Sequence, residues 1–391
     1  MRLIVLTSRF PYPLDKGDKL RAFHQLKSLS KNNEIHLISL SDTLVESNHE
    51  QELKKYCKGV HVFKLKKWKI LLNLAMGLFS NKPFQVKYFY QSAIHKKITR
   101  LIKAIDPDHI YCQLIRCVPY VQHEHHYSKT LDYMDAFSKG IERRINSASW
   151  MKPIFKIEAQ RLVKYENLAF EYFDNHCIIS EHDRLYIFHE KKNQIKIISN
   201  GIDSHYFSSK EVKKKYDLVF IGNLSYAPNI DTSLYIAQEL LPLLKEKFPL
   251  IKVLICGANP SYQLKKLAND NIEIIGWTPD IRNAYLAGKI FLAPLRIGTG
   301  LQNKLLEAMS LGLPCITSPL ANQALKAKDG EQILVANSLE QYIQQIDLLL
   351  SNQQIRESIG GKAREYIKAA FDWESSVAEL EKIMKAKQNI I

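Results

Sequence analysis

The fold of this chain is decided by one stretch near its C-terminal end, PLRIGTGLQNKLLEAMSLGLPCITSP, residues 294–319. Its order predicts the end of an apolar strand, a glycine-rich loop, a helix and a second apolar strand. Gly298 and Gly300 allow the loop backbone to approach a ligand closely. A strand, a loop and a helix in this order form one crossover of a parallel α/β sheet.

Charged side chains flank this loop. Arg296 precedes the glycines, Lys304 lies at the start of the expected helix, and Glu307 follows one turn later. Two cations beside a loop at a helix N-terminus suit a diphosphate, and a carboxylate on the same helix face suits a ribose diol. The pattern therefore predicts a site for a nucleotide diphosphate sugar. Alternatively, Lys304 and Glu307 form an ordinary surface ion pair beside a common Rossmann-like loop.

The rest of the chain alternates apolar runs with helical periodicity, which predicts parallel sheets with helices on both faces. A length of 391 residues suits two such domains. Residues 199–209 contain turn residues without strong periodicity and mark the linker. We therefore expect domains over residues 1–205 and 206–370, followed by an amphipathic helix within residues 371–391. The expected strands are residues 2–7, 34–40, 61–65, 109–114, 130–134, 176–180, 216–222, 252–257, 272–277, 290–295 and 314–318.

The charge of the chain is basic and uneven. The formal net charge is +15, and residues 1–200 hold 33 Lys and Arg against 20 Asp and Glu, or +13, which leaves +2 for residues 201–391. A basic half beside a near-neutral half suggests that one domain faces an anionic partner, such as lipid, nucleic acid or a polyanionic substrate. The sequence shows no helix-turn-helix, zinc-finger or RNA-binding pattern, so we expect no nucleic-acid partner.

The cysteines and the apolar runs indicate a cytoplasmic protein. The six cysteines are scattered and form no CxxC pair, which is typical of reduced, buried thiols. No uninterrupted apolar run reaches the roughly 18 residues of a membrane span. The apolar run at the start of the chain is too short for a signal peptide.

Residues 298–314, GTGLQNKLLEAMSLGLP, resemble the donor-site signature of glycosyltransferase family 4 in the GT-B superfamily. Four earlier segments also resemble motifs of that family and occur in the family's order. They are residues 8–30, 180–187, 199–203 and 220–236. The resemblance implies two facing Rossmann-like domains with an inter-domain cleft, and a C-terminal helix that crosses back to the first domain. It also implies transfer of a sugar from a nucleotide diphosphate sugar to an acceptor hydroxyl, with retention of configuration and without a metal or other cofactor. A free or lipid-linked glycan in bacterial surface-polysaccharide assembly is the expected acceptor.

The resemblance assigns roles around the glycine-rich loop that contains Gly298 and Gly300. Glu307 is the ribose-binding Glu of the family, while Lys304 and Arg296 are the catalytic cations that stabilise the leaving diphosphate. Thr299 stands where the family usually has a second Glu that contacts the donor sugar, and it could donate one weaker hydrogen bond at most. Gly298, Thr299 and Gly300 therefore join the donor-binding set.

Two further loops belong to the donor site by resemblance. Many family members have Gly-Arg here, with a Lys further on, and both cations hold phosphate. This chain has Gly222 and Asn223 and no Lys before Asp231, so both of those cations are missing. Gly276 and Trp277 line the base. The apolar setting of Trp277 favours packing over stacking on the base.

In the first domain, the resemblance places donor or acceptor contacts after the first strand. Gly17 lets that loop approach the donor diphosphate or the acceptor, and Lys16, Asp18 and Arg21 lie on the acceptor side. A solvated, charged turn is the alternative. Asp135 follows another expected strand, and either bonds an acceptor hydroxyl as a catalytic residue or caps the next helix.

Residues 64–80 combine cations, an aromatic ring and an apolar run. This pattern is typical of a helix at the interface of an anionic membrane, but a core helix with a basic rim shows it too. Membrane binding would make the protein peripheral at the inner face of the plasma membrane and would suit a lipid-linked acceptor. The cations are Lys64, Lys66, Lys67 and Lys69, around Trp68.

We expect no metal site. Asp106-Pro-Asp108 matches the Asp-x-Asp metal motif of the other glycosyltransferase fold, but Asp and Pro here make a turn. The histidines within residues 123–126 have no second ligand pair at zinc-like spacing. The alternatives to a transferase are a nucleotide-sugar epimerase of GT-B architecture and a non-catalytic GT-B scaffold, the latter suggested by Asn223 and Thr299.

Overall fold

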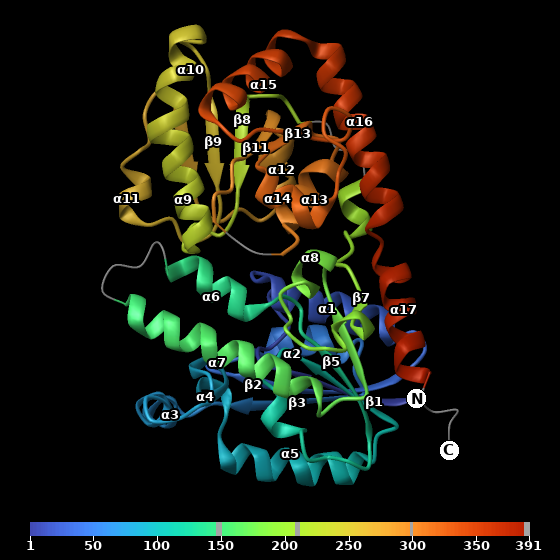
Figure 1. Cartoon of the computed structure of the whole chain (residues 1–391). Coiled ribbons are helices and arrows are strands. Elements are labelled where there is room, and N and C mark those ends of the chain that lie inside the picture. The colour runs from blue at the N-terminus through green and yellow to red at the C-terminus, as the bar shows by residue number, and fades with distance from the viewer. Residues whose placement is uncertain (146–150, 208–211, 298–299, 387–391) are drawn as a thin grey trace. The chain divides into compact units, whose positions relative to one another are not determined.

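The computed structural model describes residues 1–145, 151–207, 212–297 and 300–386. The chain divides into two compact units, Met1–Asn200 with Trp373–Ile391, and Gly201–Asp372. Each unit is a parallel sheet covered by helices (Figure 1). The expected α/β fold class, with two Rossmann-like domains, is therefore confirmed.

The first unit is built on a parallel sheet. Its strands, in spatial order, are β3 (Gly59–Lys64), β2 (Glu34–Ser41), β1 (Arg2–Thr7), β4 (His109–Gln113), β5 (Ser128–Asp132), β6 (Asn175–Ile178) and β7 (Lys196–Ile197). Its helices are α1 (Gly17–Leu29), α2 (Ser47–Lys54), α3 (Lys67–Gly77), α4 (Phe84–Phe89), α5 (Ser92–Ile105), α6 (Phe137–Ile145), α7 (Lys152–Phe170), α8 (Glu181–Arg184) and α17 (Trp373–Lys385).

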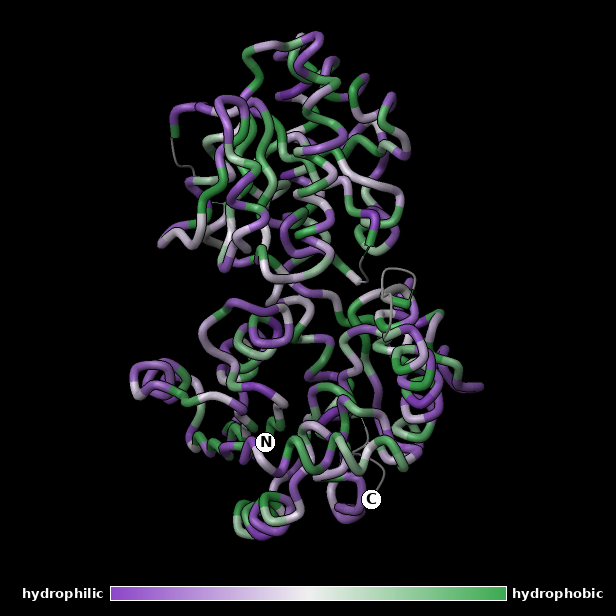
Figure 2. The backbone as a smooth tube through the Cα atoms, turned by 90° about the vertical axis from the view of Figure 1, so that its left-hand side faces the viewer, coloured by the Kyte–Doolittle hydropathy of each residue, from purple (hydrophilic) through white to green (hydrophobic). Residues whose placement is uncertain are grey.

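Strand β1 shows why helices cover both faces of this sheet. Successive side chains of a strand point to opposite faces. Leu3 of β1 belongs to a hydrophobic cluster with Leu26 of α1, whereas Ile4 belongs to a second cluster with Ile98 of α5. In Figure 2 hydrophobic residues run along the central segments of each unit. The near-continuous apolar strands of the sequence are thus strands buried on both faces.

The last helix, α17, belongs to the first unit (Figure 1). It packs on α1, where the ring of Trp373 stacks on His24 with 5.0 Å between centroids. The carboxylate of Glu381 accepts hydrogen bonds from the side-chain amides of Asn32 and Asn33, both at 3.2 Å. The chain therefore returns to the first unit after completing the second, as expected of the C-terminal helix.

The second unit repeats the architecture. Its strands, in spatial order, are β10 (Ile272–Ile275), β9 (Val253–Cys256), β8 (Tyr216–Ile221), β11 (Gly288–Ala293), β12 (Cys315–Thr317) and β13 (Leu334–Val335). Its helices are α9 (Ala227–Tyr235), α10 (Leu241–Lys247), α11 (Tyr262–Lys265), α12 (Ile281–Leu286), α13 (Asn303–Ser310), α14 (Pro319–Leu325), α15 (Leu339–Ser351) and α16 (Gln353–Ala370). A π-helical turn, Ile236–Leu240, joins α9 to α10.

The stretch over residues 294–319 adopts the predicted order. Strand β11 precedes it and pairs with β8 on one side and with β12 on the other. Helix α13 connects β11 to β12 and packs against α16. A Cβ atom at Gly360 of α16 would lie 2.1 Å from the backbone oxygen of Gly312, so glycine at residue 360 permits this close approach.

The two units divide after Asn200 rather than near residue 205. The cause is a pairing between the two points where the chain passes from one unit to the other. The backbone amide of Ile202 donates to the carbonyl of Phe371 at 3.0 Å, and Ile202 forms a parallel bridge with Asp372. Both segments therefore belong to the second unit, and the first unit resumes at Trp373.

Helix α3 and the residues after it do not form a core helix. Among Lys67–Gly77 only Ile70 and Gly77 are buried. We call the exposed apolar side chains of this segment the α3 patch; their exposed fractions range from 47% to 95%. The patch consists of Trp68, Leu71, Leu72, Met76, Leu78 and Phe79.

The helices and the cysteines bear on the expected absence of membrane spans and disulfide bonds. Among the described residues, none of the helices has the length and apolar character needed to span a bilayer. All six cysteines are buried free thiols. The core of each unit therefore forms from apolar packing rather than from disulfide bonds.

Candidate active site

The loop between β11 and α13 forms the centre of the predicted donor site. Leu295 is still buried, while Arg296 is exposed. Gly300 has a φ of +69°, a left-handed conformation that favours glycine. The side chain of Gln302 does not cap α13, so the positive end of the helix dipole faces the loop without a side-chain cap. The predicted donor residues Gly298 and Thr299 lie outside the described residues.

Lys304 lies in the first turn of α13 and points toward α9 rather than into bulk water. Its ammonium donates a hydrogen bond to the side-chain oxygen of Asn229 and lies 5.1 Å from the ring centroid of Phe220. Burial lowers the pKa of Lys304 to about 8, although the charge of Glu307 acts in the opposite direction. A desolvated ammonium of this kind gains strongly from an anionic partner.

Asn229 holds Lys304 in this position, a role that the sequence had not indicated. It is only 4% exposed, and its amide nitrogen donates to the backbone oxygen of Asn223 at 2.8 Å. A Cβ atom at Gly222 would lie 2.6 Å from that nitrogen, so glycine at residue 222 makes room for the amide. Gly222 and Asn223 thus shape the site beside Lys304.

Glu307 lies one turn after Lys304 and has a separate partner. Its carboxylate accepts a hydrogen bond of 2.7 Å from the hydroxyl of Tyr285 on α12. Tyr285 is fully buried, so this contact fixes the direction of the carboxylate. Asn229 therefore holds Lys304, and Tyr285 holds Glu307. This arrangement is more organised than an ordinary surface ion pair.

Arg296 is engaged by carboxylates in this structure. Its guanidinium donates to both oxygens of Asp231, at 2.8 and 3.1 Å, and to Glu239 at 3.0 Å. It also lies 4.5 Å from the ring centroid of Tyr235. Two carboxylates balance its charge, so Arg296 must exchange partners before it can bind a phosphate.

Gly276 and Trp277 follow β10. The Trp277 side chain is 73% exposed, so it does not pack in the core as its apolar neighbours had suggested. The exposed indole is available to stack on a planar ligand. A Cβ atom at Gly276 would lie no closer than 3.9 Å to Pro260, so packing does not require glycine there.

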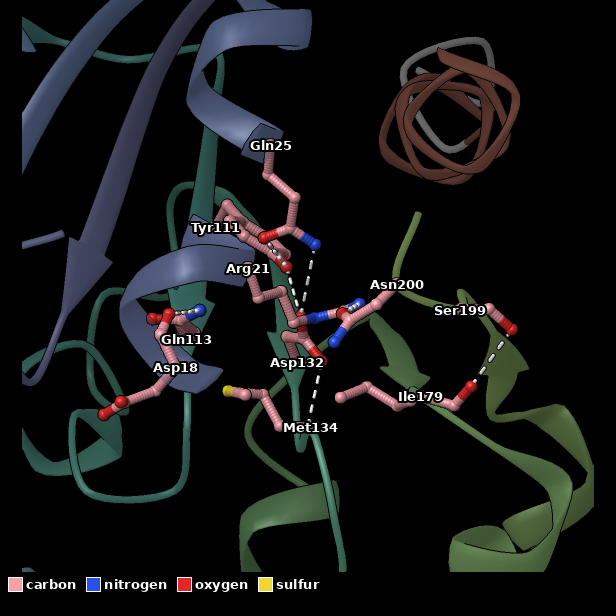
Figure 3. A network of polar contacts seen from close by, with 10 residues as sticks. All are labelled: Asp18, Arg21, Gln25, Tyr111, Gln113, Asp132, Met134, Ile179, Ser199 and Asn200. Atoms are coloured by element: carbon pink, nitrogen blue, oxygen red, sulfur yellow. Dashed lines mark hydrogen bonds and ion pairs between the residues drawn. The ribbon is translucent and has the colours of Figure 1, made fainter. Parts of the chain in front are cut away.

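In the first unit, the structure corrects the placement of Arg21. Its side chain is completely buried, and its Nε donates to Asp132 at 2.7 Å (Figure 3). Its Nη1 donates to the side-chain oxygen of Asn200 at 2.9 Å, and the hydroxyl of Tyr111 donates to the same carboxylate of Asp132. Arg21 therefore connects α1 to β5 and to Asn200 in the interior of the first unit. Its charge is not presented to an acceptor.

The other residues predicted on the acceptor side lie nearer the surface. Lys16 and Gly17 are exposed at the start of α1. The carboxylate of Asp18 accepts a hydrogen bond from Arg9 at 2.8 Å and lies 4.0 Å from a nitrogen of Arg116. Asp18 is thus part of a cluster of charges beyond β1 and β4.

Asp135 lies beside this cluster, after β5. Burial raises its pKa to about 7, the charge of Asp183 adds to that effect, and Arg116 opposes it. In the first turn of α6, the backbone amide of Ser138 donates a hydrogen bond of 3.0 Å to Oε1 of Glu166. A perturbed carboxyl group of this kind is a candidate for a proton-transfer or hydroxyl-binding role.

The described residues contain no group of three or more His, Cys, Asp and Glu side chains placed to hold a metal ion. His123 makes a ring contact with His125, and its Nε2 lies 2.8 Å from the side-chain nitrogen of Gln122. Asp106 adopts a left-handed conformation at the end of α5, where its φ is +50°. The Asp-Pro-Asp segment is therefore the turn that the sequence predicted.

Comparison with known proteins relates the second unit to a family of transferases. Residues 215–352 match the sequence model of the glycosyl transferases group 1. The chain is 24% identical over 394 residues to an uncharacterised 44.6 kDa protein in the cps region of Klebsiella pneumoniae, which covers 95% of this chain and 96% of that protein. It is 29% identical over 212 residues to an uncharacterised glycosyltransferase of Methanocaldococcus jannaschii, covering 50% of this chain and 53% of that protein.

Solved structures share the fold of the whole chain. HepE of Anabaena, in complex with UDP, aligns with a TM-score of 0.69 at 12% identity, covering 99% of this chain and 100% of that one. The fold is that of the GT-B glycosyltransferases. The second unit carries a glycosyl transferases group 1 domain, and the chain is a glycosyltransferase. The resemblance is thereby confirmed at this level, while the assignment to family 4 stays a prediction.

Proposed function

We propose that this glycosyltransferase moves a sugar from a nucleotide diphosphate sugar to a hydroxyl of a lipid-linked glycan, with retention of configuration. The observation that carries the proposal is the pair of prepared groups on α13. Lys304 is a desolvated ammonium held by Asn229, and Glu307 is a carboxylate held by Tyr285. They are the two charges needed for a diphosphate and a ribose.

The diphosphate binds in this proposal at the start of α13. The helix dipole and Lys304 both favour an anion there. When the bond between the sugar and the diphosphate breaks, negative charge grows on the leaving phosphate. Lys304 then stabilises the transition state more than the ground state, which lowers the barrier.

Glu307 binds the ribose hydroxyls in this proposal, and Trp277 stacks on the base. The carboxylate already accepts a hydrogen bond from Tyr285, which orients it toward one direction of approach. HepE of Anabaena, which shares the fold, is in complex with UDP, so uridine is the first base to test.

For a retaining transfer, the acceptor hydroxyl attacks the anomeric carbon from the face that the diphosphate leaves. The bond from that carbon to the phosphate oxygen breaks, and the bond to the acceptor oxygen forms. The hydroxyl proton passes to the departing phosphate, so the step needs no side-chain nucleophile. Asp135, with its raised pKa, orients the acceptor hydroxyl in this scheme.

We further propose that the α3 patch binds an anionic membrane surface, so that the protein works peripherally at the cytoplasmic face. The apolar side chains of the patch are exposed, and Lys64, Lys66 and Lys67 around them are exposed too. The ammonium of Lys69 lies 5.3 Å from the ring centroid of Trp68. Apolar and aromatic groups within a rim of lysines complement an anionic lipid interface.

The proposal is tested by calorimetric titration with UDP, GDP, ADP, TDP and CMP in the presence and absence of EDTA. Binding of one nucleoside diphosphate in EDTA would support a donor site that needs no metal. Turnover of the corresponding nucleotide sugar without an acceptor, giving an isomerised sugar, would instead indicate the epimerase. A protein that binds none of these nucleotides and hydrolyses no donor would fit the non-catalytic scaffold and overturn the proposal.

A further inference from the structure

A cavity of about 270 Å³ lies in the first unit beyond the carboxyl ends of β1, β2 and β4. Among the residues that line it, Arg9 follows β1, Asp42 follows β2 and Arg116 follows β4. Strand β1 lies between β2 and β4 in the sheet, so the connections leave it in opposite directions. Open α/β sheets bind ligands at such a switch point.

Two guanidinium groups form one wall of this cavity. The central carbons of Arg9 and Arg116 lie 5.9 and 5.2 Å from the ring centroid of Phe89. Both cations share the carboxylate of Asp18, at 2.8 and 4.0 Å. Burial lowers the pKa of Arg116 to about 10, and the charge of Arg9 adds to that effect. An added anion would reduce the repulsion between these two like charges.

Carboxylates accompany these cations. Asp18 lies between the two arginines, and Asp42 also lines the cavity, where its carboxylate accepts a hydrogen bond from the hydroxyl of Tyr88 at 2.7 Å. Asp135 acts on Arg116, yet its raised pKa of about 7 leaves it only partly ionised near neutral pH. Guanidinium groups in a fixed orientation match the oxygens of a phosphate well.

The cavity wall is organised before any ligand binds. The carboxylate of Glu158 on α7 accepts hydrogen bonds from the backbone amides of Phe84 and Gln85, at 2.7 and 3.1 Å, and so fixes the start of α4. Gln85 in turn accepts from Arg116, at 2.6 and 3.1 Å. Phe89 of the same helix lies beneath both arginines.

Helix α3 links the cavity to the α3 patch. Leu74 of α3 lines the cavity, whereas the patch side chains of the same segment are exposed. We infer that this cavity binds the phosphate group of the lipid-linked acceptor, with Arg9 and Arg116 as its ligands, while the lipid remains in the interface beside α3. The inference rests on the proposed function, because it names the chemical class of the proposed acceptor.

The test is a vesicle flotation assay with the full chain. One set of vesicles is pure phosphatidylcholine, a second contains a polyprenyl phosphate, and a third contains phosphatidylglycerol at the same charge. Arg9→Gln and the double variant Arg9→Gln/Arg116→Gln are compared with Arg100→Gln, which changes an exposed arginine of α5. Arg116→Lys serves as a variant that keeps the buried charge.

We expect tighter binding to polyprenyl phosphate vesicles than to phosphatidylglycerol vesicles. The double variant should lose that preference by roughly tenfold, as loss of charge-assisted hydrogen bonds predicts, while Arg100→Gln keeps it. Binding of all variants to phosphatidylglycerol should stay unchanged. Equal binding of wild type and Arg9→Gln to polyprenyl phosphate would overturn the inference.

Two further measurements separate the possible failures. If inorganic phosphate protects the wild type against thermal unfolding but the vesicles make no distinction, the cavity takes a free anion and the lipid source is wrong. UDP titration of the same variants reports on the donor site. Normal UDP binding together with no phosphate-lipid preference would reject this cavity alone, whereas absent UDP binding by the wild type would reject the proposed function.

Discussion

The ammonium of Lys304 on α13 donates a hydrogen bond to the side-chain oxygen of Asn229 on α9. The amide nitrogen of Asn229 donates to the backbone of Asn223, so one buried side chain connects the loop after β8 to the helix after β11. Many relatives are expected to have an arginine where this chain has Asn223. Here the neutral Asn229 orients Lys304. In the proposed mechanism, Lys304 therefore bears more of the charge of the leaving group.

Replacing Lys304 by methionine should lower turnover by about 10²- to 10³-fold, because an interaction with the developing charge is lost. The melting temperature should stay the same or rise, since a partly buried, desolvated ammonium opposes folding below its pKa. Steady-state kinetics and thermal unfolding measure the two effects. Lys266→Met, at an exposed position of the same unit, is the matched control.

Arg296→Gln gives the informative comparison for Lys304. Because Asp231 and Glu239 already bind Arg296, we expect its loss to reduce turnover by less than about tenfold. A loss as large as that of Lys304→Met would show that Arg296 leaves these carboxylates during turnover and binds the phosphate, as the sequence had predicted.

The affinity for nucleoside diphosphate should fall with rising pH. Lys304 is charged below its pKa of about 8 in the free protein, and a bound diphosphate raises that pKa. The dissociation constant should therefore increase by about tenfold between pH 7 and pH 9, as the free lysine loses its proton. The second ionisation of a phosphate lies near pH 6, below this window. Calorimetry across this range measures the effect.

Asn229→Asp provides a direct check on that assignment. A carboxylate beside Lys304 would raise the pKa of the lysine and compete with the diphosphate. The pH step should move upward and the affinity at pH 7 should fall. A pH step that persists unchanged in Asn229→Asp or in Lys304→Met would mean that another group titrates.

Glu307→Ala should weaken UDP binding by roughly tenfold to a hundredfold, the usual effect of losing a charged hydrogen bond. The same variant should bind 2′-deoxy-UDP about as well as the wild type does, because the hydroxyl that Glu307 contacts is missing from that ligand. Titration with both nucleotides measures the difference. Tyr285→Phe should give a smaller change in the same direction, since it loosens the carboxylate without removing it.

The strands, helices and donor loop of the second unit could be predicted because their signals are local. The glycines after β11 and the apolar periodicity around them lie within a few residues of each other. The partners of Asn229 and Arg21 could not be predicted, because Asn229 bonds Lys304, 75 residues away, and Arg21 bonds Asp132, 111 residues away. Only the register of the folded sheets brings those residues together.

The character of α3 was equally undetermined by its sequence. Leu71 and Leu72 would suit a core as well as a lipid surface, and no local pattern distinguishes the two. The structure distinguishes them because no other element of the described chain covers these side chains, which remain 69% and 50% exposed. Trp277 shows the same principle, since its apolar neighbours had suggested packing and its ring is exposed.

Arg21→Met should destabilise the first unit without a specific effect on the acceptor. Removing one partner of a buried ion pair typically costs about 3–5 kcal/mol, because the other charge is left unpaired. In Arg21→Met the unpaired charge is that of Asp132. The loss of stability corresponds to a decrease in melting temperature of roughly 10 °C. Lys16→Met, at the exposed residue that precedes α1, should change stability little. A normal melting temperature with a raised KM for the acceptor would restore Arg21 to the acceptor site.

Replacing Lys64, Lys66, Lys67 and Lys69 by glutamine should weaken binding to anionic vesicles by several orders of magnitude. Each lysine near an anionic surface contributes about 1 kcal/mol, and the effect should diminish in high salt. Leu71→Ser/Phe79→Ser should weaken binding too, but that loss should persist at high salt because it removes apolar area. Sedimentation with phosphatidylglycerol vesicles at two salt concentrations separates the two contributions. Unchanged binding in both variants would contradict a membrane role for the α3 patch, and UDP affinity should remain normal in both because the donor residues lie in the other unit.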